Sequence, residues 1–195
     1  VARFRVNVFI QRGSCAVVMR VIPTTIPTLK SIGAPQQFQE IALLRDLTER
    51  FGRAEVEHVV SGRGLINIHV VAHRDQPCRA SVDLESPDAA ASISRAALER
   101  TCPGCIETLD IFVEAYGAEA GNVALRSVAT GGVFIGGGIA PKILPALTTG
   151  AFMRAFIAKP PLETMLKAMP VKIILNSDAA LLGAAEGDRN ARRAG

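Results

Sequence analysis

Apolar and polar positions recur with two different periods along this chain, and each period predicts a type of element. A period of two over residues 3–10 and 15–22 predicts two strands that form a hairpin. Residues 23–35 contain three prolines, so we expect a linker without regular structure. From Phe38 the period changes to that of a helix, which Gly52 should end. The apolar face expected for this helix consists of Ile41, Leu44, Leu47 and Phe51.

The pattern beyond Gly52 predicts helices mixed with short strands. We expect strands over 56–60, 133–135 and 171–175, and helices over 61–73, 86–100, 106–129, 143–147, 152–157, 162–169 and 178–185. Ser61, Ser86 and Asp178 are the expected caps of their helices. Strands that alternate with helices place the chain in the α/β class.

Composition narrows the class of protein. A chain of 195 residues, 49% of them apolar, can bury a substantial core. No apolar run approaches the roughly 18 residues that cross a bilayer, and three arginines interrupt the apolar N-terminus. We therefore expect neither a membrane helix nor a signal peptide. Four cysteines are few for this length, which favours the reducing cytoplasm.

The net charge of +4 is concentrated at one end of the chain. Residues 1–39 contain five basic residues and no acidic ones, and removing those five from the 22 leaves 17 basic against 18 acidic residues. Aromatic residues make up only 5% of the sequence. A basic stripe interleaved with aromatics, as nucleic-acid binding requires, is therefore not predicted.

A glycine-rich stretch offers the clearest candidate for chemistry. Gly136, Gly137 and Gly138 follow the apolar run Val133–Ile135, and Pro141 stands where a first helical residue would fall. Three residues without Cβ let a bulky ligand approach the backbone, and the expected helix N-terminus suits phosphate oxygens. The simpler interpretation is a strand-to-helix turn without a ligand.

The cysteines and histidines offer weaker candidates. Cys102 and Cys105 could form a redox pair or half of a zinc site, but no second CxxC occurs and His73 lies 29 residues earlier. We expect ordinary thiols at a helix junction and predict no metal ligand. His58, His69 and His73 are expected to be exposed or packed, without a catalytic role.

Several of these segments together resemble the C-terminal part of bacterial glucokinases, which belong to the actin-like, hexokinase-type ATPases. The similarity runs from about Glu40 to Ala185. It rests on Glu40-Ile-Ala-Leu-Leu, Glu57-His-Val-Val-Ser-Gly-Arg-Gly-Leu65, Ala120-Gly-Asn-Val-Ala-Leu125, the glycine stretch and residues 170–184. The resemblance implies an actin-like, ribonuclease H-like ATPase fold, with residues 39–195 as the C-terminal large domain. Residues 1–38 would be a separate, poorly determined hairpin and linker.

The same resemblance implies an activity and a site. A glucokinase transfers the γ-phosphoryl group of ATP to the C6 hydroxyl of glucose, with Mg²⁺ bound to the nucleotide. In the family the glycine stretch borders the adenosine, which assigns Gly136, Gly137 and Gly138 to nucleotide binding. Glu57 matches a glutamate that accepts hydrogen bonds from sugar hydroxyls. ATP and glucose are the implied ligands, the cytoplasm is the implied location, and a homodimer is left open.

The chain also departs from the family pattern. The family's Asp-Gly-Gly-Thr, Asn-Asp-Phe-Glu and Glu-Gly-Gly-His motifs, the second of which holds the catalytic aspartate, do not occur here. We therefore predict no catalytic residue and no activity in this chain alone. The hypothesis is a truncated glucokinase whose first 38 or so residues come from a shifted reading frame or a gene-model error. Upstream DNA that encodes the missing motifs in frame with Val1 would contradict it.

Two alternatives remain. One is a non-catalytic nucleotide- or sugar-binding domain derived from a sugar kinase. The other is a Rossmann-type dinucleotide domain, which ranks last because Gly136-Gly-Gly-Ile-Ala-Pro141 is not a G-x-G-x-x-G sequence.

Overall fold

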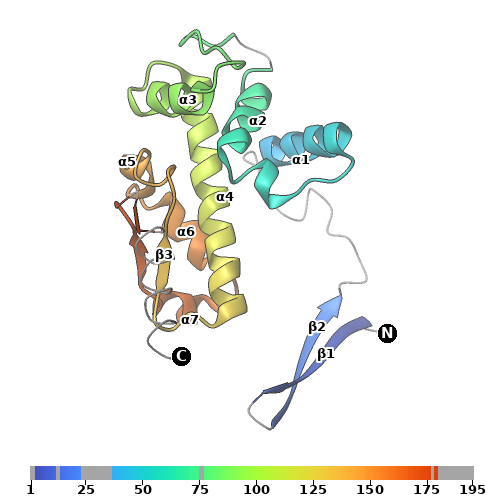
Figure 1. Cartoon of the computed structure of the whole chain (residues 1–195). Helices are drawn as coiled ribbons and strands as arrows, with labels where there is room; N and C mark the ends of the chain where they lie inside the picture. Colours follow the sequence, from blue (N-terminus) through green and yellow to red (C-terminus); the bar gives the residue numbers. More distant parts are fainter. Residues whose placement is uncertain (1–2, 12–13, 23–36, 75–76, 177, 180–195) are drawn as a thin grey trace, which may run out of the picture. The chain divides into compact units, whose positions relative to one another are not determined.

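The computed structural model describes residues 3–11, 14–22, 37–74, 77–176 and 178–179 (Figure 1). Two compact units divide the chain, Val1–Phe38 and Gln39–Gly195. In the first unit, strands β1 (Arg3–Gln11) and β2 (Ser14–Ile22) pair in antiparallel register. The predicted hairpin is therefore confirmed.

The second unit is helix-rich. In chain order its described elements are α1 (Gln37–Phe51), which begins at the unit boundary, the 3-10 helix η2 (Val56–His58), α2 (Gly62–Ala72), α3 (Ala89–Leu98), α4 (Pro103–Ser127), β3 (Val133–Ile135), α5 (Leu144–Leu147), α6 (Ala151–Ile157), α7 (Glu163–Lys167) and β4 (Val171–Ile173). None of the described helices combines the length and apolarity that crossing a membrane would require.

Helix α4 organises this unit. It runs the length of the unit in Figure 1, with α2 and α3 packed along one half and α6 along the other. Its buried positions recur every three or four residues: Cys105, Thr108, Leu109, Phe112, Val113, Gly117, Ala120, Gly121 and Ala124. Burial of Phe112 alone contributes about 2–3 kcal/mol by removing its ring from water.

The contact between α4 and α6 depends on two glycines. A Cβ added at Gly117 would overlap the carbonyl oxygen of Phe152, and one added at Gly121 would overlap that of Phe156. The two helix backbones can therefore approach this closely only because residues 117 and 121 have no side chain.

The small sheet of this unit is parallel. Val133 of β3 pairs with Val171 of β4, and Ile135 pairs with Ile173. The connection between the two strands passes through α5, α6 and α7, as a parallel pair requires. This helical crossover fits the predicted α/β class.

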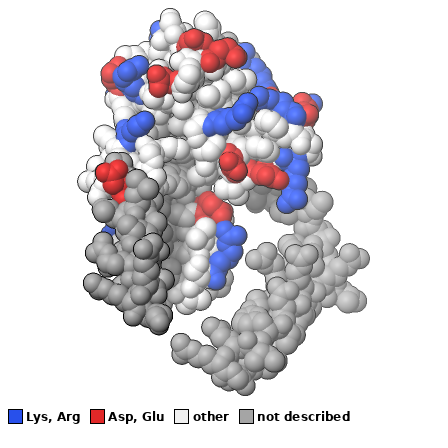
Figure 2. Space-filling model, in the orientation of Figure 1, with Lys and Arg blue, Asp and Glu red and all other residues white. Residues whose placement is uncertain are grey.

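The charged surface of the second unit is mixed. Figure 2 shows basic and acidic side chains interspersed on the face that it presents. Asp46 of α1 accepts from both Arg50, at 3.4 Å, and Arg74, at 3.1 Å. Such exposed pairs are worth about 0–1 kcal/mol each, so packing around α4 dominates the stability of this unit.

Three sequence predictions about local structure were wrong. Residues 56–58 form η2 instead of a strand, because Glu55 donates its backbone N–H to His58 Nδ1 and closes a tight turn. Helix α3 begins at Ala89, since the Ser86 hydroxyl accepts the N–H of Asp88 within a turn instead of capping the helix. Leu44 is 56% exposed, whereas Leu43 and Leu47 are the buried leucines of α1.

Two other predicted helices, α2 and α4, are present in the structure. Helix α2 begins after Ser61, whose hydroxyl accepts the N–H of Gly64 at 2.9 Å, so this cap is confirmed. The helix expected from Ile106 already begins at Pro103, which places the CxxC sequence at the start of α4. The helix expected over 178–185 lies largely outside the described residues.

Candidate functional site

A pocket of about 600 Å³ lies between the helices α2 and α3 and the turn that follows β3. This volume is within the range of small-molecule sites. Its lining is mainly apolar, with four charged side chains: Asp88, Arg95, Glu99 and Lys142. Gly138 also lines it. Gly136 and Gly137 do not line it, so Gly138 alone of the three glycines borders this cavity, which is large enough for a nucleoside.

The three glycines have different surroundings. Gly137 has φ +100°, a conformation that L side chains rarely adopt. A Cβ at Gly137 or Gly138 would meet no atom within 4 Å, whereas one at Gly136 would lie 3.5 Å from the Ile174 side chain. The positive φ therefore explains why residue 137 is a glycine. At Gly138, the open space beside the backbone would accommodate a ligand.

The helix expected after the glycine stretch begins later than Pro141. Pro141 lies in a turn, and α5 begins only at Leu144 and has four residues. The backbone N–H groups of Lys142 and Ile143 both bond to the carbonyl oxygen of Ile139. They are therefore not available to phosphate oxygens, and positive charge at this side of the pocket comes from the side chain of Lys142.

Glu57 lies outside this pocket. Its side chain is exposed on η2, and it is not among the residues that line the cavity. The Ser61 hydroxyl donates to the Glu57 carbonyl oxygen at 2.7 Å and caps α2 at the same time. The position of Glu57 is thereby tied to the start of α2, whose first residue Gly62 does line the pocket.

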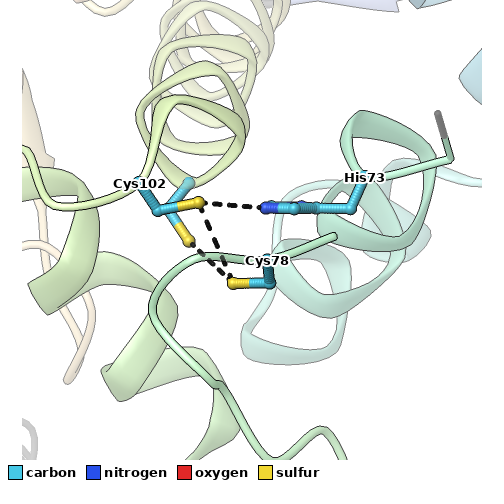
Figure 3. A group of neighbouring side chains, drawn as sticks. His73, Cys78 and Cys102 are labelled. Atoms are coloured by element: carbon cyan, nitrogen blue, oxygen red, sulfur yellow. Dashed lines mark hydrogen bonds between the residues drawn. The ribbon is translucent and has the colours of Figure 1, made fainter. Parts of the chain in front are cut away.

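A second group of residues comes together where α2 and α4 meet. His73, Cys78, Cys102 and Cys105 each offer one ligand-type atom, and these atoms all lie within 4.8 Å of one another. Figure 3 shows the side chains of His73, Cys78 and Cys102 pointing toward one another. We call these four residues the thiol–imidazole cluster. Sequence reasoning did not combine them, although His73 and Cys78 form an H-x4-C sequence upstream of the CxxC.

The environment of the cluster shifts several pKa values. Burial alone would raise the pKa of Cys102, but its hydrogen bonds with the His73 side chain and with the backbone of Cys105 and Arg79 lower it to about 6. Burial, reinforced by the neighbouring thiols, raises the pKa of Cys105. The sulfur atoms therefore differ in how easily they become thiolates.

The three histidines also differ. His69 is buried, and burial together with the charge of His73 lowers its pKa to about 4, so it is neutral at pH 7. His58 stacks on the ring of Phe51 with centroids 4.2 Å apart. His58 and His69 are therefore packed against neighbouring residues, whereas the His73 ring contacts the thiol of Cys102.

Comparison with known proteins identifies relatives of this chain. A sequence model of the Glucokinase family matches residues 7–190. Glucokinases of Synechocystis sp. and Nostoc punctiforme are 37% and 38% identical, and each alignment covers 78% of this chain. These alignments cover 48% and 50% of the relatives, so the chain spans about half the length of the curated relatives it matches.

A solved structure agrees with this result. The crystal structure of a glucokinase from an Antarctic psychrotroph matches with a TM-score of 0.66 and 26% identity. The match covers 92% of this chain and 52% of that one. The described fold is therefore that of a sugar kinase, over a part of such an enzyme.

Proposed function

We propose that this chain, which belongs to the glucokinase family, forms the nucleotide-binding part of an enzyme that phosphorylates glucose with ATP. The observation that supports this most directly is the pocket that Gly138 lines together with residues of α2 and α3. We further propose the cytoplasm, where ATP is available, as its location.

In this proposal residues 39–195 form the C-terminal large domain of an actin-like ATPase, and residues 1–38 are a separate segment. The parallel β3–β4 pair and the turn after β3 support the assignment, since ligands of α/β folds bind at the carboxyl ends of strands. Phe134 of β3 is 61% exposed, as expected if further elements of a full-length enzyme cover this face of the parallel sheet.

The adenosine of MgATP would occupy the pocket, close to Gly136, Gly137 and Gly138. The open space beside Gly138 accepts a ligand without a side chain in the way, and Lys142 and Arg95 supply positive charge. Mg²⁺ would arrive on the phosphate oxygens as part of the substrate.

Glu57 would accept hydrogen bonds from two hydroxyls of glucose, which a carboxylate can do with its two oxygens. In the transfer, the C6 oxygen bonds to the γ-phosphorus and the bond from that phosphorus to the β,γ-bridging oxygen breaks. The hydroxyl proton passes to a carboxylate, which we place outside this chain. This chain would therefore contribute positioning and charge.

A coupled assay for glucose 6-phosphate tests the function. We expect no turnover by this chain with saturating MgATP and glucose, and turnover after the family's upstream motifs are joined to residue 39. Turnover by the chain alone would refute our prediction that the carboxylate that accepts the proton lies outside this chain. If neither protein turns over but ATP binds, a non-catalytic binding domain is favoured instead. The match to only 48% of the Synechocystis glucokinase also fits that alternative.

The role of Glu57 has its own test. Replacing Glu57 with glutamine in the completed protein should lower kcat/KM for glucose by about 10- to 100-fold, because hydrogen bonds to a charged group are worth about 1.5–3 kcal/mol. The KM for ATP should not change. Glu85→Gln, which removes the same charge from an exposed position of the chain, should leave both constants as they are. Equal effects of the two substitutions would rule out sugar binding by Glu57.

A further inference from the structure

We propose that the thiol–imidazole cluster of His73, Cys78, Cys102 and Cys105 is a structural zinc site. It lies apart from the pocket described above, because none of the four residues lines that pocket. Three sulfur atoms and one imidazole nitrogen are a ligand set of closed, tetrahedral zinc sites.

The distances between the ligand atoms suit a tetrahedron around one ion. Zinc bonds of about 2.3 Å to sulfur and 2.0–2.1 Å to nitrogen give edges of about 3.6–3.8 Å between ligand atoms. Cys78 Sγ lies 3.9 Å from Cys102 Sγ and 3.8 Å from Cys105 Sγ. His73 Nε2 lies 3.2 Å from Cys102 Sγ. The largest separation within the group is 4.8 Å, so small side-chain rotations complete the arrangement.

The imidazole of His73 is already oriented for coordination. Its Nδ1 lies 2.9 Å from the carbonyl oxygen of His69 and can donate its proton there. This leaves Nε2, the atom that faces the sulfur atoms in Figure 3, as the unprotonated nitrogen. A backbone carbonyl is one of the common partners for the second nitrogen of a histidine bound to a metal.

Gly104 makes room for this ring. A Cβ at Gly104 would lie 2.5 Å from His73 Nε2, closer than real contacts allow. The CxxC sequence therefore contains a glycine at the position where the histidine approaches, and a larger residue there would push the imidazole away from the three sulfur atoms.

The ligands come from three separate segments. His73 follows the last turn of α2, Cys78 belongs to the segment between α2 and α3, and Cys102 and Cys105 lie at the start of α4. The described residues 77–88 form neither helix nor strand. A zinc ion would join this segment to both helices, which is the role of a structural metal.

Redox chemistry suits the cluster less well. A thiol that exchanges disulfides must be accessible, but Cys102 is 1% and Cys105 0% exposed. A third sulfur and an oriented imidazole would also have no part in a two-cysteine exchange. We therefore favour the metal over a dithiol pair.

The first test measures metal in the full chain, purified under reducing conditions from zinc-supplemented cells. We expect one equivalent of zinc by elemental analysis, and its loss in Cys78→Ser. Cys15→Ser is the matched control, because Cys15 belongs to β2 in the other unit, and it should retain the metal. A wild-type chain without metal, or a Cys78→Ser variant that keeps it, would overturn the site.

Cobalt substitution avoids relying on variants that fail to fold. The wild-type chain loaded with Co²⁺ should show thiolate-to-metal charge transfer and the intense visible bands of a tetrahedral ion. Gly104→Ala, which removes no ligand, should bind zinc about 10- to 100-fold more weakly, the usual cost of disturbing a ligand's orientation. An octahedral cobalt spectrum, or a disulfide among Cys78, Cys102 and Cys105 in the freshly purified chain, would refute the proposal.

Discussion

Chains with leucine in place of Gly138 should lose nucleotide binding and keep their fold. Gly138 lines the pocket, so a leucine there occupies space that the nucleoside needs. A Cβ at this residue meets no atom within 4 Å, and its φ lies outside the left-handed region, so the free protein should accommodate the change. We expect at least about a 100-fold loss of affinity for ADP, equivalent to about 2.7 kcal/mol, with an unchanged Tm.

Titration calorimetry with ADP on the full chain measures this effect, and thermal unfolding measures the fold. Gly131→Leu provides the matched control, because a Cβ there also meets open space and Gly131 does not line the pocket. Equal affinity of wild type and Gly138→Leu would remove the pocket from the proposed function. Failure of the wild-type chain to bind ADP would contradict nucleotide binding by this unit altogether.

Replacement of Gly117 by alanine should destabilise the second unit, although alanine is the better helix former. By propensity alone the change would stabilise α4 by about 1 kcal/mol. The added methyl group, however, would overlap the carbonyl oxygen of Phe152, which belongs to the backbone of α6 and cannot rotate away. Overpacking of this kind costs about 1–3 kcal/mol. We therefore expect a net loss in the free energy of unfolding.

Urea unfolding followed by circular dichroism tests the sign of this change. Gly62→Ala is the control within a helix, because its Cβ would lie 4.0 Å from the nearest atom, that of Ala90. Gly62→Ala should leave stability equal or higher, whereas Gly117→Ala should lower it. Stabilisation by both substitutions would show that α4 and α6 separate more readily than their packing in this structure implies.

Much of the secondary structure could be predicted because the signals were local. Periodicity located the hairpin, α2, α4 and β3 within a few residues. Local signals also misled: the apolar run 56–60 suggested a strand, but η2 forms there because the His58 ring binds the backbone of Glu55. The choice between Leu43 and Leu44 as the buried residue depended on what α1 packs against, which a helical period cannot specify.

The sequence by itself determined the family, the glycine stretch and the α/β class, because these depend on short motifs, on their order along the chain and on local periodicity. Only the tertiary structure decided which residues share a site. Gly138 lines a pocket with α3, Gly117 contacts α6, and His73 reaches Cys102 across 29 residues. These contacts form because α2, α3 and α6 bury their apolar faces against α4, and no spacing along the chain records which residues that packing brings together.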